Sequence, residues 1–147
     1  MTLKSIMIAS ALLLTSSQQA VWAASACAYS DMAGKWEIIA NNTDGNSLSR
    51  CKITITSQTS SATGSSATCT TAYSYDGSVG STSVSLGAST FTKTTVSSCS
   101  FKVTFKLGGD SSTAYVTMSQ GKDMLSGAWL MNNDSDQGGT IIGTNIP

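Results

Sequence analysis

Hydrophobic and polar residues alternate with a period of two along much of this chain. Between Cys99 and Leu107, phenylalanine, valine and leucine occupy every second position, and lysine or threonine stands between them. Successive side chains of a β-strand point to opposite faces, so this pattern predicts a strand with one buried and one hydrated face. The segment Arg50–Thr56 has the same period. The alternation therefore favours antiparallel sheet over helix.

The composition extends this prediction to the rest of the chain. Serine and threonine make up about a third of the residues, and the single proline, Pro147, is the last residue. Such a Thr-rich, β-branched composition is typical of strands. We expect an all-β fold, a single antiparallel β-barrel of about eight strands, with a two-sheet β-sandwich as the alternative. Further strands are expected at Gly34–Ala40, Ala67–Tyr75, Val79–Leu86, Ser89–Val96, Leu125–Met131 and Thr140–Ile146.

Two turns decide which side chains meet in this sheet. If Gly108-Gly109-Asp110-Ser111 forms a four-residue loop, Phe105 faces Ala114 and apolar residues pair along the whole hairpin. An even-numbered loop near Gly121–Asp123 directs Trp129 into the barrel. A three-residue loop would instead direct Ala128 and Leu130 inward. We favour the even loop, because it buries the tryptophan.

The first 23 residues resemble an export signal. Lys4 is followed by the apolar stretch from Ile6 to Leu14, and small residues near Ala23 fit a cleavage site. We therefore expect a signal peptide at 1–23, a single domain at 24–147, and a secreted or periplasmic protein. No transmembrane segment is expected after cleavage.

The four cysteines all follow the predicted signal. An even number of cysteines in an oxidising compartment predicts two disulfides. Three connectivities are possible. We prefer Cys51–Cys69, which would join the two arms of a hairpin, together with Cys27–Cys99, which would pin the N-terminal segment to a strand.

Charge and residue content argue against several functions. The chain has no histidine, so it lacks Ser-His-Asp and Cys-His catalysis and ordinary histidine-ligated metal sites. Its eight basic and eight acidic residues balance, and the basic ones form no cluster, so nucleic acid is not an expected partner. The polar segment from Asn132 to Gly138 is interpreted as a hairpin loop, not a calcium site. We expect a non-enzymatic protein without cofactor or metal.

A Gly-x-Trp tripeptide, Gly34-Lys35-Trp36, stands at the predicted first strand. Here the chain resembles the lipocalin-like, or calycin, group of small barrels. This resemblance implies that Trp36 plugs the closed end of the barrel and that the interior holds a small apolar ligand. Gly127-Ala128-Trp129 repeats the tripeptide and is similar to the tryptophan pattern of avidin-like barrels. The candidate ligand-binding residues are Trp36, Tyr73, Tyr75, Phe105 and Trp129.

A second resemblance points to another function. Trp36 and the pair Cys51/Cys69 are also similar to periplasmic metalloprotease inhibitors, which are small exported barrels. In that family a short N-terminal segment enters the protease, and it would correspond to residues 25–30 here. Three hypotheses follow: binding of a small apolar ligand, a protein-interaction or protease-inhibitor domain, and a structural surface-associated protein.

Overall fold

A computed structural model describes residues 26–43, 45–75, 78–95 and 98–147, and the predicted signal peptide at 1–23 lies outside these ranges. Within the described residues the fold is nearly all β. One short 3-10 helix, η1 (Tyr29–Met32), precedes the sheet. The strands are β1 (Gly34–Asn42), β2 (Ser47–Ser57), β3 (Ala62–Gly64), β4 (Ala67–Tyr75), β5 (Ser78–Leu86), β6 (Ser89–Lys93), β7 (Ser100–Leu107), β8 (Asp110–Met118), β9 (Met124–Met131) and β10 (Asp134–Ile146).

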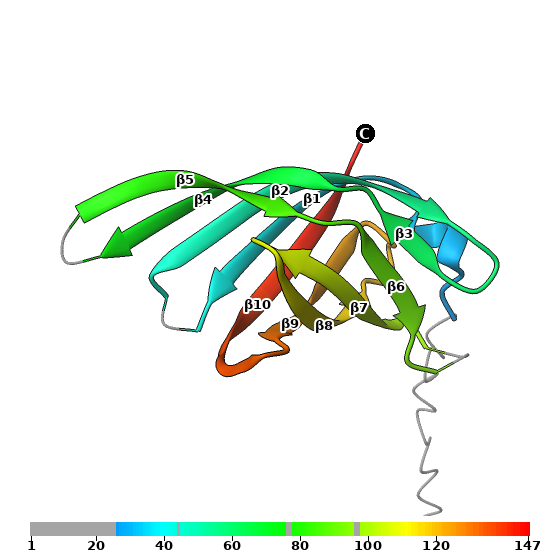
Figure 1. Ribbon diagram of the computed structural model, residues 1–147. Helices are drawn as coiled ribbons and strands as arrows, with labels where there is room; N and C mark the ends of the chain where they lie inside the picture. Colours follow the sequence, from blue (N-terminus) through cyan, green and yellow to red (C-terminus); the bar gives the residue numbers. More distant parts are fainter. Residues whose placement is uncertain (1–25, 44, 76–77, 96–97) are drawn as a thin grey trace, which may run out of the picture.

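Eight of these strands close into an antiparallel barrel. The ring runs β1, β10, β9, β8, β7, β6, β3 and β2, and the pairing of β1 with β2 completes it (Figure 1). β4 and β5 are two further strands of the same sheet. The predicted barrel is thus confirmed, and the alternative of two separate packed sheets is wrong, because every strand belongs to one sheet that closes on itself.

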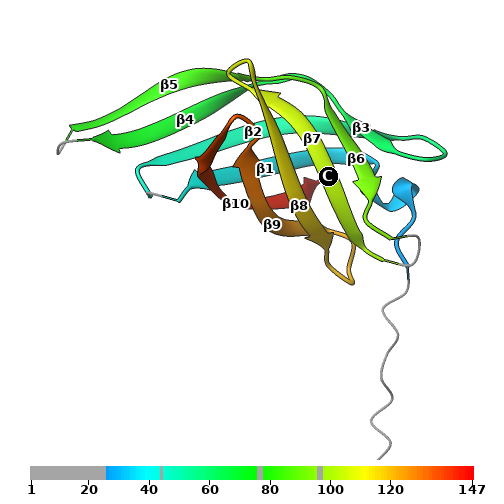
Figure 2. The ribbon, with the colours of Figure 1, turned by 60° about the horizontal axis from the view of Figure 1, so that its bottom comes forward.

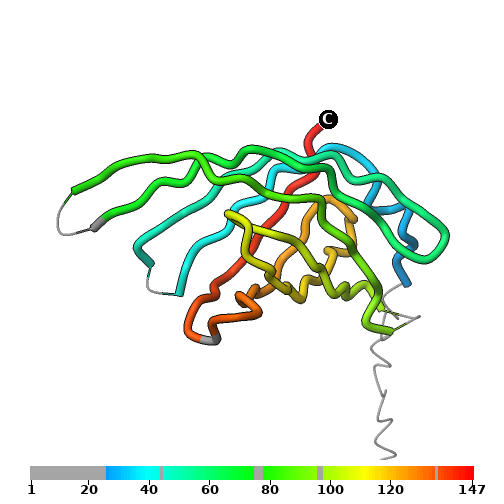
Figure 3. The backbone as a smooth tube through the Cα atoms, viewed as in Figure 1, coloured from blue at the N-terminus to red at the C-terminus, as the bar shows by residue number. Residues whose placement is uncertain are grey.

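The wall of the barrel divides between β2 and β7. The last residues of β2, from Ile55, pair with β3, whereas its first residues, from Ser47, pair with β4. In the same way β7 pairs with β6 through Phe101–Thr104, but with β5 only at Leu107 among the described residues. β3 and β6 therefore complete the wall at the end near η1. At the other end the β4–β5 hairpin projects beyond the barrel, as Figures 2 and 3 show.

The hairpin of β7 and β8 differs from the predicted register by two residues. Phe105 faces Ser112, and Val103 faces Ala114, because the turn contains only Gly108 and Gly109 between the paired residues Leu107 and Asp110. Both glycines have positive φ, 62° and 102°. Two successive residues with positive φ favour the tight two-residue turn that matches strand twist. A shift of two keeps each side chain on its predicted face.

Most of the inward-facing residues of the alternating strands are buried in the barrel interior. Trp36 and Phe101 are fully buried, and Trp129 is buried as the even-loop interpretation requires, since Met118 faces Leu125 and Ala114 faces Trp129. Phe105 points inward but is only half-buried. Other large inward-facing residues of these strands are also buried, among them Ile38, Ile53, Ile55, Val103, Val116 and Met118.

Both preferred disulfides are present. Cys27 is bonded to Cys99 and Cys51 to Cys69, with Cα–Cα distances of 4.9 and 4.4 Å. The first joins the segment before η1 to the segment before β7. The second lies inside the barrel wall, where Cys51 and Cys69 are both buried.

Candidate functional site

The helix η1 closes one end of the barrel. Its last residue, Met32, is completely buried, and the indole Nε1 of Trp36 donates a hydrogen bond of 2.7 Å to the Met32 carbonyl oxygen. A buried indole N–H requires such an acceptor. The hydroxyl of Tyr29 accepts a bond of 2.9 Å from the Lys93 backbone N–H. Trp36 thus lies at the closed end, where the lipocalin-like resemblance implied it would be.

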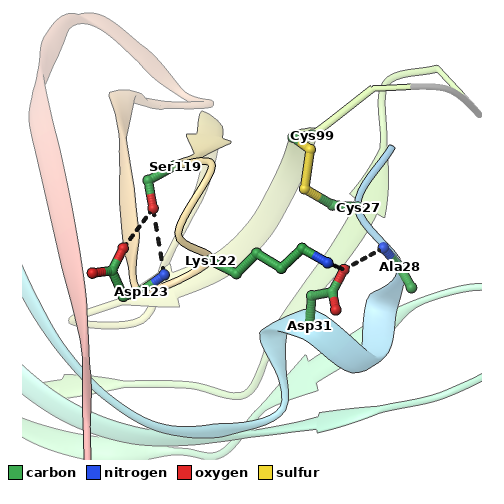
Figure 4. Close-up of polar contacts among 7 residues, drawn as sticks. All are labelled: Cys27, Ala28, Asp31, Cys99, Ser119, Lys122 and Asp123. Atoms are coloured by element: carbon green, nitrogen blue, oxygen red, sulfur yellow. Dashed lines mark hydrogen bonds and ion pairs between the residues drawn. A yellow bond between two sulfur atoms is a disulfide. The ribbon is translucent and has the colours of Figure 1, made fainter. Parts of the chain in front are cut away.

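Covalent and ionic contacts hold η1 in place (Figure 4). The Cys27–Cys99 disulfide lies beside it, and the Asp31 carboxylate accepts bonds from Lys122 Nζ, at 2.9 Å, and from the Ala28 backbone N–H, at 2.7 Å. These two donors, Lys122 first, lower the pKa of Asp31 below its ordinary value. The N-terminal segment is therefore anchored on the barrel from Cys27 onward.

The interior toward the other end contains an apolar cavity of about 50 Å³. Residues from β1, β2 and β5 to β10 line it, and most of them are aliphatic or aromatic. Ile38 and Ile53 contribute from β1 and β2, Phe105 and Leu107 from β7, and Trp129 from β9. No lining residue carries a charge, so the cavity suits an uncharged group.

The way into this cavity is the end opposite η1, which we call the open end. The inward-facing residues of that end are Ala40, Phe105, Leu107, Met131 and Ile141, and each is only half-buried. At the closed end the corresponding side chains of Met32, Trp36 and Phe101 have no exposed surface. A ligand would therefore reach the cavity past Phe105 and Leu107.

A few hydroxyl groups interrupt the apolar interior. Ser49 and Thr71 bond to each other at 2.8 Å and are both buried. Ser89 lines the cavity, and its buried hydroxyl has no hydrogen-bond partner among the described residues. The Ser112 hydroxyl is also buried without a hydrogen-bond partner among the described residues. Buried hydroxyls without partners are uncommon in folded proteins.

The structure brings together two of the five predicted ligand-binding residues. Phe105 and Trp129 both line the cavity. Trp36 belongs to the plug at the closed end and does not line it. Tyr73 lies on the projecting β4–β5 hairpin, 40% exposed, with its ring over Gly80. Tyr75 ends β4, and its side chain lies outside what the structure describes.

Trp129 is held against the cavity wall by a close approach of three strands. Its indole Nε1 donates to the Asn41 carbonyl oxygen at 3.2 Å. A Cβ atom at Gly139, which lies between these two residues, would be 1.6 Å from that same oxygen. Glycine at 139 therefore lets β1, β9 and β10 approach closely enough for the indole bond. Sequence reasoning missed Gly139, Leu107 and Ser89, because nothing in their local pattern distinguishes them from other strand residues.

Metal and membrane features are not found in the part of the chain that the structure describes. It contains no group of three or more cysteine or acidic side chains placed to hold a metal ion. It also contains no helix long and apolar enough to cross a membrane.

Comparison with known proteins supports the fold. No protein-family model matches the sequence, and no curated protein matches it. Among solved structures, the chain is similar to a redesigned β-barrel, mFAP0, bound to DFHBI, with a TM-score of 0.55 and 11% identity over 78% of this chain and 99% of that one. It is also similar to a de novo designed fluorescence-activating β-barrel, with a TM-score of 0.54 and 8% identity over 80% and 96% of the two chains. The class defined by fold is therefore the small antiparallel β-barrel.

Proposed function

We propose that this protein is a non-enzymatic barrel that binds a small apolar ligand through its open end. The observation that carries the proposal is the uncharged cavity bounded by Phe105, Leu107 and Trp129. Ligand sites in proteins are typically concave, mostly apolar and partly preformed. The similar redesigned barrel was solved with the small molecule DFHBI, which supports this use of the fold. The two disulfides support action in an oxidising compartment outside the cytoplasm.

The size of the cavity limits what it holds. An engineered apolar cavity of about 150 Å³ accepts benzene, and this one is about 50 Å³. A larger ligand must therefore place one apolar end inside and extend through the open end, or displace the half-buried Phe105 and Leu107. Because the lining is uncharged, a charged head group would stay outside. A straight-chain fatty acid, with its methyl end inside, has this shape.

Fluorescence titration tests the proposal. Octanoic and dodecanoic acid are added to the protein while tryptophan emission is recorded. We expect saturable changes that survive in Trp36→Phe and disappear in Trp129→Phe, because Trp129 lines the cavity and Trp36 does not. Calorimetry on the same samples checks that Trp129→Phe has lost the signal and not the binding.

A matched pair of variants locates the site. Ala40 lines the cavity, and its neighbour Ile39 points outward and is 38% exposed. Ala40→Leu fills part of the cavity and should weaken binding about tenfold or more, whereas Ile39→Leu should leave binding unchanged. Equal binding by both variants, or no binding of either fatty acid by the unaltered protein, contradicts the proposal.

A further inference from the structure

β5 leaves one backbone edge unpaired. On its first side it pairs with β4 along its whole length, from Ser78 opposite Tyr75 to Leu86 opposite Ala67. On its second side, among the described residues, only Leu86 pairs with a strand, at Leu107 of β7. The rest of β5 extends away from the barrel with β4 (Figures 1 and 2).

The hydrogen bonds beside the Leu86–Leu107 pair show which backbone groups of β5 point away from β4. The Ser85 carbonyl oxygen accepts a bond from the Gly108 N–H, so it points toward β7 and away from β4. The N–H and C=O of one residue share a side in an antiparallel ladder, and successive residues alternate. The backbone groups of Val79, Ser81 and Ser83 therefore also point to this side.

The free edge is accessible and has none of the usual protective features. Val79 is 82% exposed, and Ser81 and Ser83 are exposed as well. Natural edges are blocked by charged side chains, proline or bulges. The segments 67–75 and 78–92 contain no charged residue and no proline. The β4–β5 register also runs without a shift. An uncovered edge of this kind is a template for another strand.

We propose that β5 pairs antiparallel with β5 of a second copy of this chain, across a two-fold axis. With Ser81 opposite Ser81, Val79 faces Ser83 of the partner subunit, and the free backbone groups of both strands meet. A strand that carried charge would repel its own copy in this arrangement. From Ser78 to Ser85 this strand has only small, uncharged side chains, so self-pairing meets no such repulsion. The assembly stops at a dimer, because the pairing occupies the one free edge of β5 in each copy.

Analytical ultracentrifugation over a concentration series tests the proposal. We expect a dimer whose population rises with concentration and no larger assembly. Ser81→Pro removes a free-edge N–H and leaves the bonds to β4 intact, because the Ser81 N–H points away from β4. It should raise the dimer dissociation constant about tenfold or more. Ser81→Ala keeps the backbone donor and should have the unaltered constant.

A charged pair of variants covers the case in which Ser81→Pro does not fold. Ser81→Lys places like charges across the axis and should also raise the dimer dissociation constant, whereas Thr68→Lys, exposed on β4 and away from the edge, should not. Circular dichroism verifies that each variant keeps the sheet. The proposal fails if the unaltered protein is monomeric up to its solubility limit or forms assemblies larger than a dimer. It also fails if a folded Ser81→Pro or Ser81→Lys protein has the same dimer dissociation constant as the unaltered protein, or if either control raises that constant equally.

Discussion

The two ends of this barrel are built from the same strands but differ in what fills them. At the closed end, η1, a disulfide and fully buried aromatic rings leave no path to the interior. At the open end, half-buried side chains surround an apolar cavity, and the β4–β5 hairpin extends past them. Close packing supplies stability, and incomplete packing leaves space for a ligand. We therefore expect the closed end to contribute most of the stability and, on the proposed function, the open end to receive the ligand.

Among the changes considered, removal of the disulfides is expected to lower the free energy of unfolding most. Cys27–Cys99 spans 72 residues and Cys51–Cys69 spans 18. By the chain-entropy relation their removal costs about 4.4 and about 3.2 kcal/mol of unfolding free energy. Replacing each pair by alanine and measuring urea denaturation gives the two values. A smaller loss for the Cys27–Cys99 pair would contradict its role in anchoring the closed end.

Two phenylalanines of one strand provide a matched test of packing. Phe101 and Phe105 share the inner face of β7, but Phe101 is completely buried and Phe105 half-buried. We expect Phe101→Ala to cost roughly 4 kcal/mol, and Phe105→Ala less than about 2 kcal/mol. Phe105→Ala should instead alter fatty-acid affinity. Equal destabilisation by the two variants would show that the ends are equally packed.

Loss of the ion pair of Asp31 and Lys122 is expected to change the free energy of unfolding least. The pKa of Asp31 is lowered in the folded protein, chiefly by Lys122. Its contribution is therefore present at pH above the ordinary carboxyl value and lost as the pH falls through the lowered value, below about 4. Because the Lys122 side chain is 39% exposed, the pair is expected to contribute less than about 1 kcal/mol at neutral pH.

Thermal unfolding of Asp31→Ala, Lys122→Ala and the double variant at two pH values measures this coupling. The coupling energy should be detectable at pH 7 and vanish at pH 2. A coupling that persists in acid would show that the stabilisation does not come from the ionised carboxylate.

The barrel and its two disulfides could be predicted from the sequence because both follow from local patterns. Alternation in Arg50–Thr56 and Cys99–Leu107 defined inner and outer faces, and a hairpin after Arg50–Thr56 made Cys51 and Cys69 candidate partners. The inward orientation of Trp129 followed from the preference for an even-numbered loop near Gly121–Asp123. The predicted register of β7 and β8 was wrong because it was chosen to pair Phe105 with the apolar Ala114. The Gly-Gly pair instead forms a two-residue turn, which places Phe105 opposite Ser112 and still leaves each side chain on its predicted face.

The site was predicted less completely for a different reason. Aromatic residues were the expected lining, but Trp36 is used in the plug, and Tyr73 lies on the projecting hairpin. A Ser/Thr-rich strand has the same pattern whether its edge is paired or free, so the projection of β4 and β5 could not be read from it. The free edge and the cavity both depend on where strands far apart in sequence meet.

On the proposed function, ligands enter the open end and do not reach the closed end. Nuclear magnetic resonance of the indole N–H groups of Trp36 and Trp129 during titration with dodecanoic acid distinguishes the two ends. We expect the Trp129 signal to shift in a saturable way while the Trp36 signal stays unchanged, because the Trp36 indole is hydrogen-bonded to Met32 at the closed end. A saturable shift of the Trp36 signal with an unchanged Trp129 signal would contradict it.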